Sequence, residues 1–170
     1  MRYSIFLFFV LLSISSCKTD DNFIFEIPYR SLNFQVPPGV SVLNYHQFSI
    51  DLDAKQVLDA VSGGNSYGEI VPRSAVIQSL DLEQSLAFAA DISVTICNAG
   101  DTDPNCGREI FWKNPTAFSE STPSNLWANE NDISEYLESG DVVIKVKFSQ
   151  LRSTTFQELN LILDLDFVAR

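Results

Sequence analysis

Histidine is nearly absent from this chain, and its scarcity narrows the chemistry that the chain can perform. His46 is the only histidine among 170 residues, so a Ser-His-Asp or Cys-His mechanism would have to use it. No serine lies in a Gly-x-Ser-x-Gly setting, and zinc sites usually draw on several histidine and cysteine ligands. Because a catalytic site needs convergent partners, we expect His46 to be a structural residue at a strand start, hydrogen-bonded to the backbone.

Basic residues are also few. The sequence has 11 Lys and Arg against 22 Asp and Glu, which gives a formal net charge of −11 at pH 7. Nucleic-acid phosphates require a basic face, so we expect no nucleic-acid partner. The same excess of negative charge disfavours electrostatic binding of the protein to an anionic lipid surface. Because the acidic residues are scattered along the chain, we expect most of them to be solvated surface.

The apolar run at the N-terminus, residues 3–14, has 12 residues, whereas a spanning helix needs roughly 20. Arg2 before it and small residues after it are typical of an export signal, but no Ala-x-Ala-like cleavage site follows. The tetrapeptide Ile14-Ser15-Ser16-Cys17 instead resembles the lipobox of bacterial lipoproteins. This resemblance implies removal of residues 1–16 and lipidation of Cys17, so the membrane is the first expected partner. The alternative is a secreted protein with an incidental cysteine.

The polar residues 18–22, Lys-Thr-Asp-Asp-Asn, come directly after Cys17. They resemble the Lys-plus-acidic signal that sends lipoproteins of Bacteroidota to the outer face of the outer membrane. A solvated tether would have a similar composition. We therefore expect a signal peptide over 1–16, a lipidated cysteine and tether over 17–22, and one domain over 23–170. The expected location is the outer membrane, held by lipid, with surface exposure implied by the resemblance.

Cys97 and Cys106 remain once Cys17 carries lipid, and an even pair outside the cytoplasm indicates a disulfide. The eight residues between them include Gly100, Asp101 and Pro104, a turn-rich composition that can bring two strand ends together. A closed loop of about ten residues would stabilise the fold by about 2–3 kcal/mol. Two free buried thiols are the competing interpretation.

Period-two alternation of apolar residues dominates the rest of the chain and predicts strands. It is clearest over 142–148 and 159–168, which we interpret as an antiparallel pair. Further strands are expected from shorter alternating runs or from the turns and strands that flank a segment. They are 23–27, 32–36, 48–52, 74–82, 92–97 and 109–113. Seven or eight short strands separated by turns predict an all-β fold, a single antiparallel β-sandwich that is Ig-like or similar.

Two short helices are expected to connect the layers of this sandwich. Asp53 with Gln56 forms a capping-box pattern before an apolar helical face that ends at Gly63. Asp132 with Glu135 repeats the pattern, and Gly140 is the expected stop.

Several short segments together resemble uncharacterised flavobacterial (Bacteroidota) lipoproteins. They are Val36-Pro37-Pro38-Gly39, Tyr45-His46-Gln47-Phe48, Pro72-x-Ser74-Ala75, Ile92 to Cys97, Arg108-Glu109-Ile110-Phe111-Trp112, Leu151-Arg152 and Leu163 to Phe167. The resemblance spans most of the chain after Cys17. It implies a β-rich fold and carries over neither an activity nor a catalytic residue.

Asp101-x-Asp103-x-Asn105 is the one metal candidate in the sequence, because oxygen ligands on alternate loop residues can converge on Ca²⁺. The sixth position is Cys106 rather than Gly, and the twelfth is Trp112 rather than Glu. The competing interpretation is an Asx-rich turn at the edge of the sandwich, with no cofactor.

The candidate ligand surface is the stretch from Phe111 to Trp127. Trp112, Phe118 and Trp127 occur there among asparagine, serine and proline residues. Aromatic rings in such a setting can stack on sugar faces while amides and hydroxyls bind the rim. The alternative is that both tryptophans plug the end of the sandwich as core residues.

These observations favour a non-catalytic, membrane-anchored lipoprotein that binds a partner protein or a glycan at the cell envelope. A second hypothesis is an accessory structural subunit of an outer-membrane complex. A third is a glycan hydrolase that uses paired carboxylates, since sequence spacing alone cannot locate such a pair among 22 acidic residues.

Overall fold

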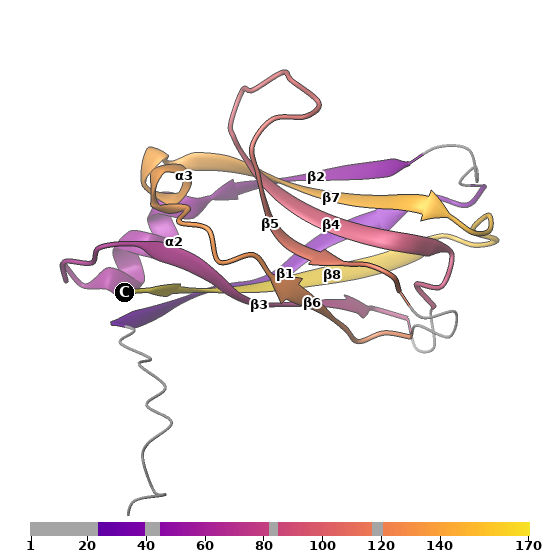
Figure 1. Ribbon diagram of the computed structural model, residues 1–170, viewed down its shortest axis with the longest axis horizontal. Helices are drawn as coiled ribbons and strands as arrows, with labels where there is room; N and C mark the ends of the chain where they lie inside the picture. The colour runs from indigo at the N-terminus through magenta and orange to yellow at the C-terminus, as the bar shows by residue number, and fades with distance from the viewer. Residues whose placement is uncertain (1–23, 40–44, 82–84, 117–120) are drawn as a thin grey trace, which may run out of the picture.

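The computed structural model describes residues 24–39, 45–81, 85–116 and 121–170, and these form a sandwich of two facing layers (Figure 1). Cys17, the predicted signal peptide and tether, and Phe118 lie outside the described residues. In the part of the chain that is described, no helix has the length and apolar character that crossing a bilayer requires.

Eight antiparallel strands make up the two layers. The first layer has the order β1 (Phe25–Val36), β8 (Leu159–Ala169), β3 (Ile70–Ser79) and β6 (Ser124–Ala128). The second has the order β5 (Arg108–Lys113), β4 (Ala89–Asn98), β7 (Asp141–Leu151) and β2 (His46–Asp53). A short β5–β6 pairing joins the layers. The predicted all-β antiparallel sandwich is therefore confirmed, and its strand order is that of a jelly roll.

The predicted pairing of the last two strands is wrong. β7 pairs with β2 and β4, whereas β8 pairs with β1 and β3 in the opposite layer. Both strands alternate buried and partly exposed residues along their length. Two such strands can cover their apolar faces by facing each other across the core, and this satisfies the alternation as well as edge-to-edge pairing would.

Two boundaries also differ from the prediction. The runs 23–27 and 32–36 belong to one strand, β1, which passes through Pro28 and has an irregular register between Tyr29 and Leu32. Among the described strands, β1 pairs with β8 alone and so lies at the edge, where a proline is tolerated because one side of the backbone needs no partner. β6 was not predicted, because its five residues lie in a polar stretch that resembles a loop.

Aromatic side chains join the two layers across the interior. Phe111, Phe148 and Phe167 are fully buried. The rings of Phe111 and Phe167 lie 5.8 Å apart between β5 and β8, and those of Phe34 and Phe148 lie 6.2 Å apart between β1 and β7. Full burial of such a side chain contributes about 1.5–3 kcal/mol, so these contacts hold the two layers in register.

The two predicted helices are present at the end of the sandwich where β1 begins and β8 ends (Figure 1). α2 (Ala54–Ser62) begins as expected, with the Asp53 carboxylate accepting from Gln56 N at 3.0 Å, and ends at Gly63. α3 (Ser134–Ser139) lacks the expected capping box. Asp132 accepts instead from Ser134 N at 3.0 Å and Ile70 N at 3.2 Å, which ties α3 to β3.

Candidate functional site

The outer face of the β2-β7-β4-β5 layer presents polar and aromatic side chains. In β4 the side chains of Ile92, Val94 and Ile96 are fully buried. Because side chains alternate along a strand, those of Ser93 and Thr95 point outward. The cross-strand register then determines which residues of the neighbouring strands share this outer face with them.

One row of this outer face runs through Ser93. Ser93 is opposite Trp112 of β5 on one side and Lys147 of β7 on the other, and Lys147 is opposite Gln47 of β2. Trp112 is opposite Trp127 of β6, which extends the row to a fifth strand. Neighbouring strands lie about 4.8 Å apart, so this row is about 19 Å long.

A second row runs through Thr95, one step further along the same face. Thr95 is opposite Glu109 of β5 and Lys145 of β7, and Lys145 is opposite Ser49 of β2. The outer face therefore places two lysines, one carboxylate and several hydroxyl groups beside two indoles. The alternation of apolar and polar residues over 142–148 predicted that Lys145 and Lys147 lie together on the polar side of their strand. It did not predict which residues of other strands lie beside them.

The tryptophan pair, Trp112 and Trp127, lies where the two layers join. Their ring centroids are 4.6 Å apart at an interplanar angle of 75°, an edge-to-face contact. Trp127 is 49% exposed and Trp112 is half-buried. Neither indole is a core residue, so the expectation that both plug the end of the sandwich does not describe them. The structure brings together two of the three predicted ligand-binding aromatics.

A hollow of about 240 Å³, which we call the sheet groove, opens on this outer face next to Trp112. Its floor is formed by strand residues and its wall by the loop between β4 and β5. The lining residues are Gln47, Ser93, Thr95, Pro104, Asn105, Cys106, Gly107, Glu109, Lys145 and Lys147. The groove thus lies directly along the row that carries the tryptophan pair.

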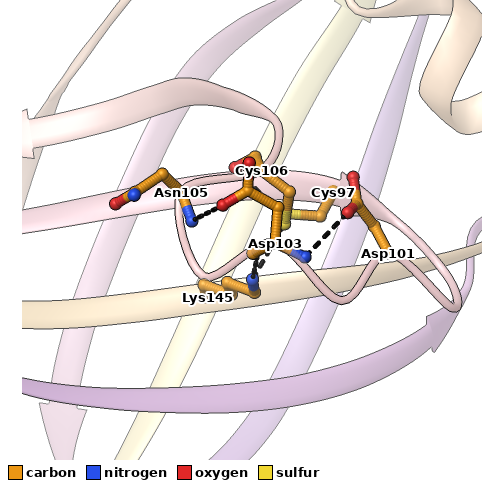
Figure 2. The surroundings of a disulfide bond; sticks show 6 residues. All are labelled: Cys97, Asp101, Asp103, Asn105, Cys106 and Lys145. Atoms are coloured by element: carbon orange, nitrogen blue, oxygen red, sulfur yellow. Dashed lines mark hydrogen bonds between the residues drawn. A yellow bond between two sulfur atoms is a disulfide. The ribbon is translucent and has the colours of Figure 1, made fainter.

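The wall of the sheet groove is held by the predicted disulfide. Cys97 and Cys106 are bonded, with their Cα atoms 5.7 Å apart. Figure 2 shows Lys145 under the same loop, where its Nζ donates to Asp103 O at 3.1 Å and lies 2.8 Å from Cys106 Sγ. The disulfide and Lys145 therefore fix the loop against the outer face of the sheet.

Gly107 allows this close approach. Its φ is +83°, and a Cβ there would lie 1.9 Å from Ile96 O and 2.8 Å from Cys97 Sγ. No other residue type can occupy such a position without moving the backbone. A glycine directly after a disulfide cysteine is visible in the sequence, but the close approach of the backbone at Gly107 was not predicted from it.

The predicted calcium ligands have other roles in the loop. Asp101 Oδ1 accepts from Asp103 N at 3.0 Å, and Asp103 Oδ1 accepts from Asn105 N at 2.8 Å (Figure 2). These are consecutive Asx turns. Across the described ranges, no three His, Cys, Asp or Glu side chains come together as metal ligands would. The ammonium of Lys145 also occupies the neighbourhood of Asp103 O.

Glu109 is the acid of the sheet groove. Partial burial raises the pKa of its carboxyl group, and the negative charge of Asp91 raises it further. Asp91 also lies on β4 and accepts from Ser149 Oγ at 2.6 Å. Glu109 is therefore more easily protonated than an isolated glutamate, which is a property of general acids as well as of crowded carboxylates.

His46 points inward at the start of β2, where its ring stacks on Phe48 at 6.4 Å. Its buried Nε2 has no hydrogen-bond partner among the residues that the structure describes, so this atom does not make the expected hydrogen bond to the backbone. Desolvation lowers the pKa of the imidazole, which favours its neutral form. Its position in the interior, away from the sheet groove, agrees with a structural residue.

The β7–β8 connection lies at the opposite end of the sandwich from the helices (Figure 1). A larger hollow of about 630 Å³ lies between this connection and residues 85–88. Phe156 lines it and is 93% exposed. Its one lining cation, Arg152, donates to Thr116 O at 2.7 Å. This hollow offers apolar contact and hydroxyl groups, whereas the sheet groove combines aromatic rings with charge.

Fold and site together define an eight-stranded jelly roll with an aromatic and polar patch on the outer face of one layer. No protein-family model matches the chain, and no curated protein does. Among solved structures, it resembles a chain of Cocksfoot mottle virus with a TM-score of 0.32 and 10% sequence identity. The match covers 85% of this chain and 81% of the viral chain. A similarity of this size carries no argument about function.

Proposed function

We propose that this chain is a non-catalytic, lipid-anchored binding module of the bacterial envelope that binds a glycan on the outer face of its β2-β7-β4-β5 layer. The observation that carries the proposal is the tryptophan pair, partly exposed beside the sheet groove. Exposed indoles offer flat apolar surfaces to sugar rings, and neighbouring hydroxyl and amide groups can bind the sugar hydroxyls.

The proposed anchor is the lipidated Cys17, in the outer membrane of a member of the Bacteroidota. β1 begins at the end of the sandwich that carries α2, α3 and the C-terminus (Figure 1). A tether entering there would leave the outer face of the β2-β7-β4-β5 layer at the side of the module, open to a ligand. Mass spectrometry tests this part, since the proposal requires a diacylglycerol thioether on Cys17 and an unacylated terminus would contradict it.

A glycan array with the purified chain, followed by calorimetric titration, tests the binding role. Trp127→Ala should weaken binding at least 10-fold, equivalent to about 1.4 kcal/mol, because it removes one stacking surface. The fold should remain, since nearly half of the side chain is exposed. Phe156→Ala is the matched control, because Phe156 is also an exposed aromatic residue but lies at the far loop end.

The outcomes of this experiment are distinct. Retained affinity in Trp127→Ala, or loss of affinity in Phe156→Ala, would move the binding site away from the tryptophan pair. Collapse of the fold in Trp127→Ala would make the indole a structural residue. Absence of any glycan ligand on the array would favour the accessory-subunit hypothesis, and pull-down from solubilised membranes would then identify the protein partner.

A second candidate function is favoured by one observation. Glu109 and Asp91 lie on the same outer face, and the charge of Asp91 helps to raise the pKa of Glu109. Such a pair could supply an acid and a base for glycoside hydrolysis. Incubation with a panel of glycans decides between the two roles, because turnover that disappears in Glu109→Gln would establish a hydrolase, whereas the binding module predicts no turnover.

A further inference from the structure

We propose that the glycan is acidic, and that Lys145 and Lys147 bind its carboxylate or sulfate groups in the sheet groove while the tryptophan pair stacks on an adjoining sugar. This inference rests on the proposed function and adds the chemical class of the ligand.

The two lysines are placed as a pair. They are two residues apart on β7, both on its outward side, and both line the sheet groove. Residues at this spacing have Cα atoms about 7 Å apart along a strand. Both residues are half-buried, and both side chains line the sheet groove.

Neither lysine forms a salt bridge with a carboxylate of the described residues, and this separates them from other cations of the molecule. Five described basic residues, Arg30, Lys55, Arg73, Arg108 and Arg170, form salt bridges with carboxylates. No carboxylate lies within salt-bridge distance of Lys145 or Lys147 among the described residues, although the chain has twice as many acidic as basic residues.

The contacts that the two ammonium groups do make are with neutral groups. Lys145 Nζ contacts Asp103 O and Cys106 Sγ, which leaves one of its three N–H donors for a ligand. Lys147 Nζ lies 4.4 Å from the centre of the Tyr45 ring, a cation–π contact. A positive charge without a carboxylate partner is stabilised when an anion binds beside it.

One extended ligand can span the distance between the tryptophan pair and Lys147. Trp112 is two strands from Lys147 on the same row, with Ser93 between them, which corresponds to about 10 Å. A chain of two or three sugars could therefore contact both the indoles and the lysines. Glu109 is the opposing charge in the groove, so a bound anion should be repelled by it.

Calorimetric titration of the full chain with three probes tests the inference: heparin, which carries sulfate and carboxylate, polygalacturonate, which carries carboxylate alone, and neutral dextran. We expect binding of at least one acidic probe. Lys147→Gln should weaken it at least 10-fold, Glu109→Gln should strengthen it, and added salt should weaken it. Lys55→Gln is the matched control, because it removes the same charge on α2 and should change affinity less than 2-fold.

The probes separate failure of this inference from failure of the proposed function. Binding of dextran that depends on Trp127 and not on Lys147 would overturn the acidic ligand and leave the glycan-binding role intact. If Lys147→Gln and Lys55→Gln weaken the binding of the acidic probe equally, the effect is one of net charge. This result would also overturn the inference. Binding of polygalacturonate assigns the carboxylate, and binding of heparin alone assigns the sulfate.

Discussion

Replacement of Gly107 by alanine should destabilise the protein much more than the same replacement at Gly100. Both glycines lie in the β4–β5 loop with nearly equal dihedral angles, φ of +83° and +81°. Left-handed backbone costs an alanine about 1–2 kcal/mol, which is partly offset by a gain of about 0.4–1 kcal/mol from reduced freedom of the unfolded chain. Gly100→Ala should therefore lower the free energy of unfolding by about 0–1.6 kcal/mol.

Gly107 has an additional cost because of its surroundings. A Cβ at Gly100 meets nothing within 4 Å, whereas a Cβ at Gly107 would lie 1.9 Å from Ile96 O. The end of β4 or the start of β5 would have to shift by more than 1 Å to remove this overlap, and forced shifts of this kind cost about 1–3 kcal/mol more. The wall of the sheet groove would move with the backbone, since Gly107 and Cys106 belong to it.

Thermal unfolding followed by circular dichroism measures the difference between the two variants. For a domain of this size 1 kcal/mol corresponds to about 2–4 °C, so Gly107→Ala should unfold about 2–12 °C below Gly100→Ala. Equal melting temperatures would refute the close approach of β5 to the end of β4. They would also contradict the role of Gly107 in positioning the groove wall.

Three further predictions concern the loop and the interior. Cys97→Ala with Cys106→Ala should lower the unfolding free energy by about 2–3 kcal/mol through loss of a ten-residue ring, and unchanged chemical denaturation would contradict this. Burial lowers the pKa of His46 below its unfolded value, so the unfolded chain binds the proton first and stability should fall below about pH 6.5, by at most about 1.4 kcal/mol per pH unit. His46→Leu should flatten this pH dependence, and a dependence that persists would assign it to another group. Calorimetric titration with millimolar Ca²⁺ should give no heat, because no three His, Cys, Asp or Glu side chains of the described residues come together as ligands; heat that disappears in Asp103→Asn would restore the calcium site.

Local features of the fold were predictable from the sequence because their causes are local. The alternation of apolar residues in 142–148 and 159–168 follows from one face of each strand being buried. The cap at Asp53 depends on a residue three positions later. The Cys97–Cys106 disulfide was predicted from the turn residues between the two cysteines, once Cys17 was assigned to the lipid anchor.

The partners of the strands were not predictable in the same way. β7 and β8 are consecutive in the chain, but their alternation does not say whether they pair at their edges or face each other across the core. The sheet groove depends on which strands pair, because Lys147 lies in the same row as Trp112 only when β7 is beside β4. β6 was missed since a five-residue strand with one buried leucine carries too little alternation to stand out from a loop.

Tryptophan fluorescence tests the central claim most directly. The chain has two tryptophans, and both belong to the proposed site, so the indole emission reports on that site alone. We predict that acrylamide quenches this emission in the free protein, and that a saturating acidic glycan protects the indoles from quenching and shifts their emission wavelength. Emission that is inaccessible to acrylamide, or that a bound glycan leaves unchanged, would contradict a ligand-binding role for the tryptophan pair.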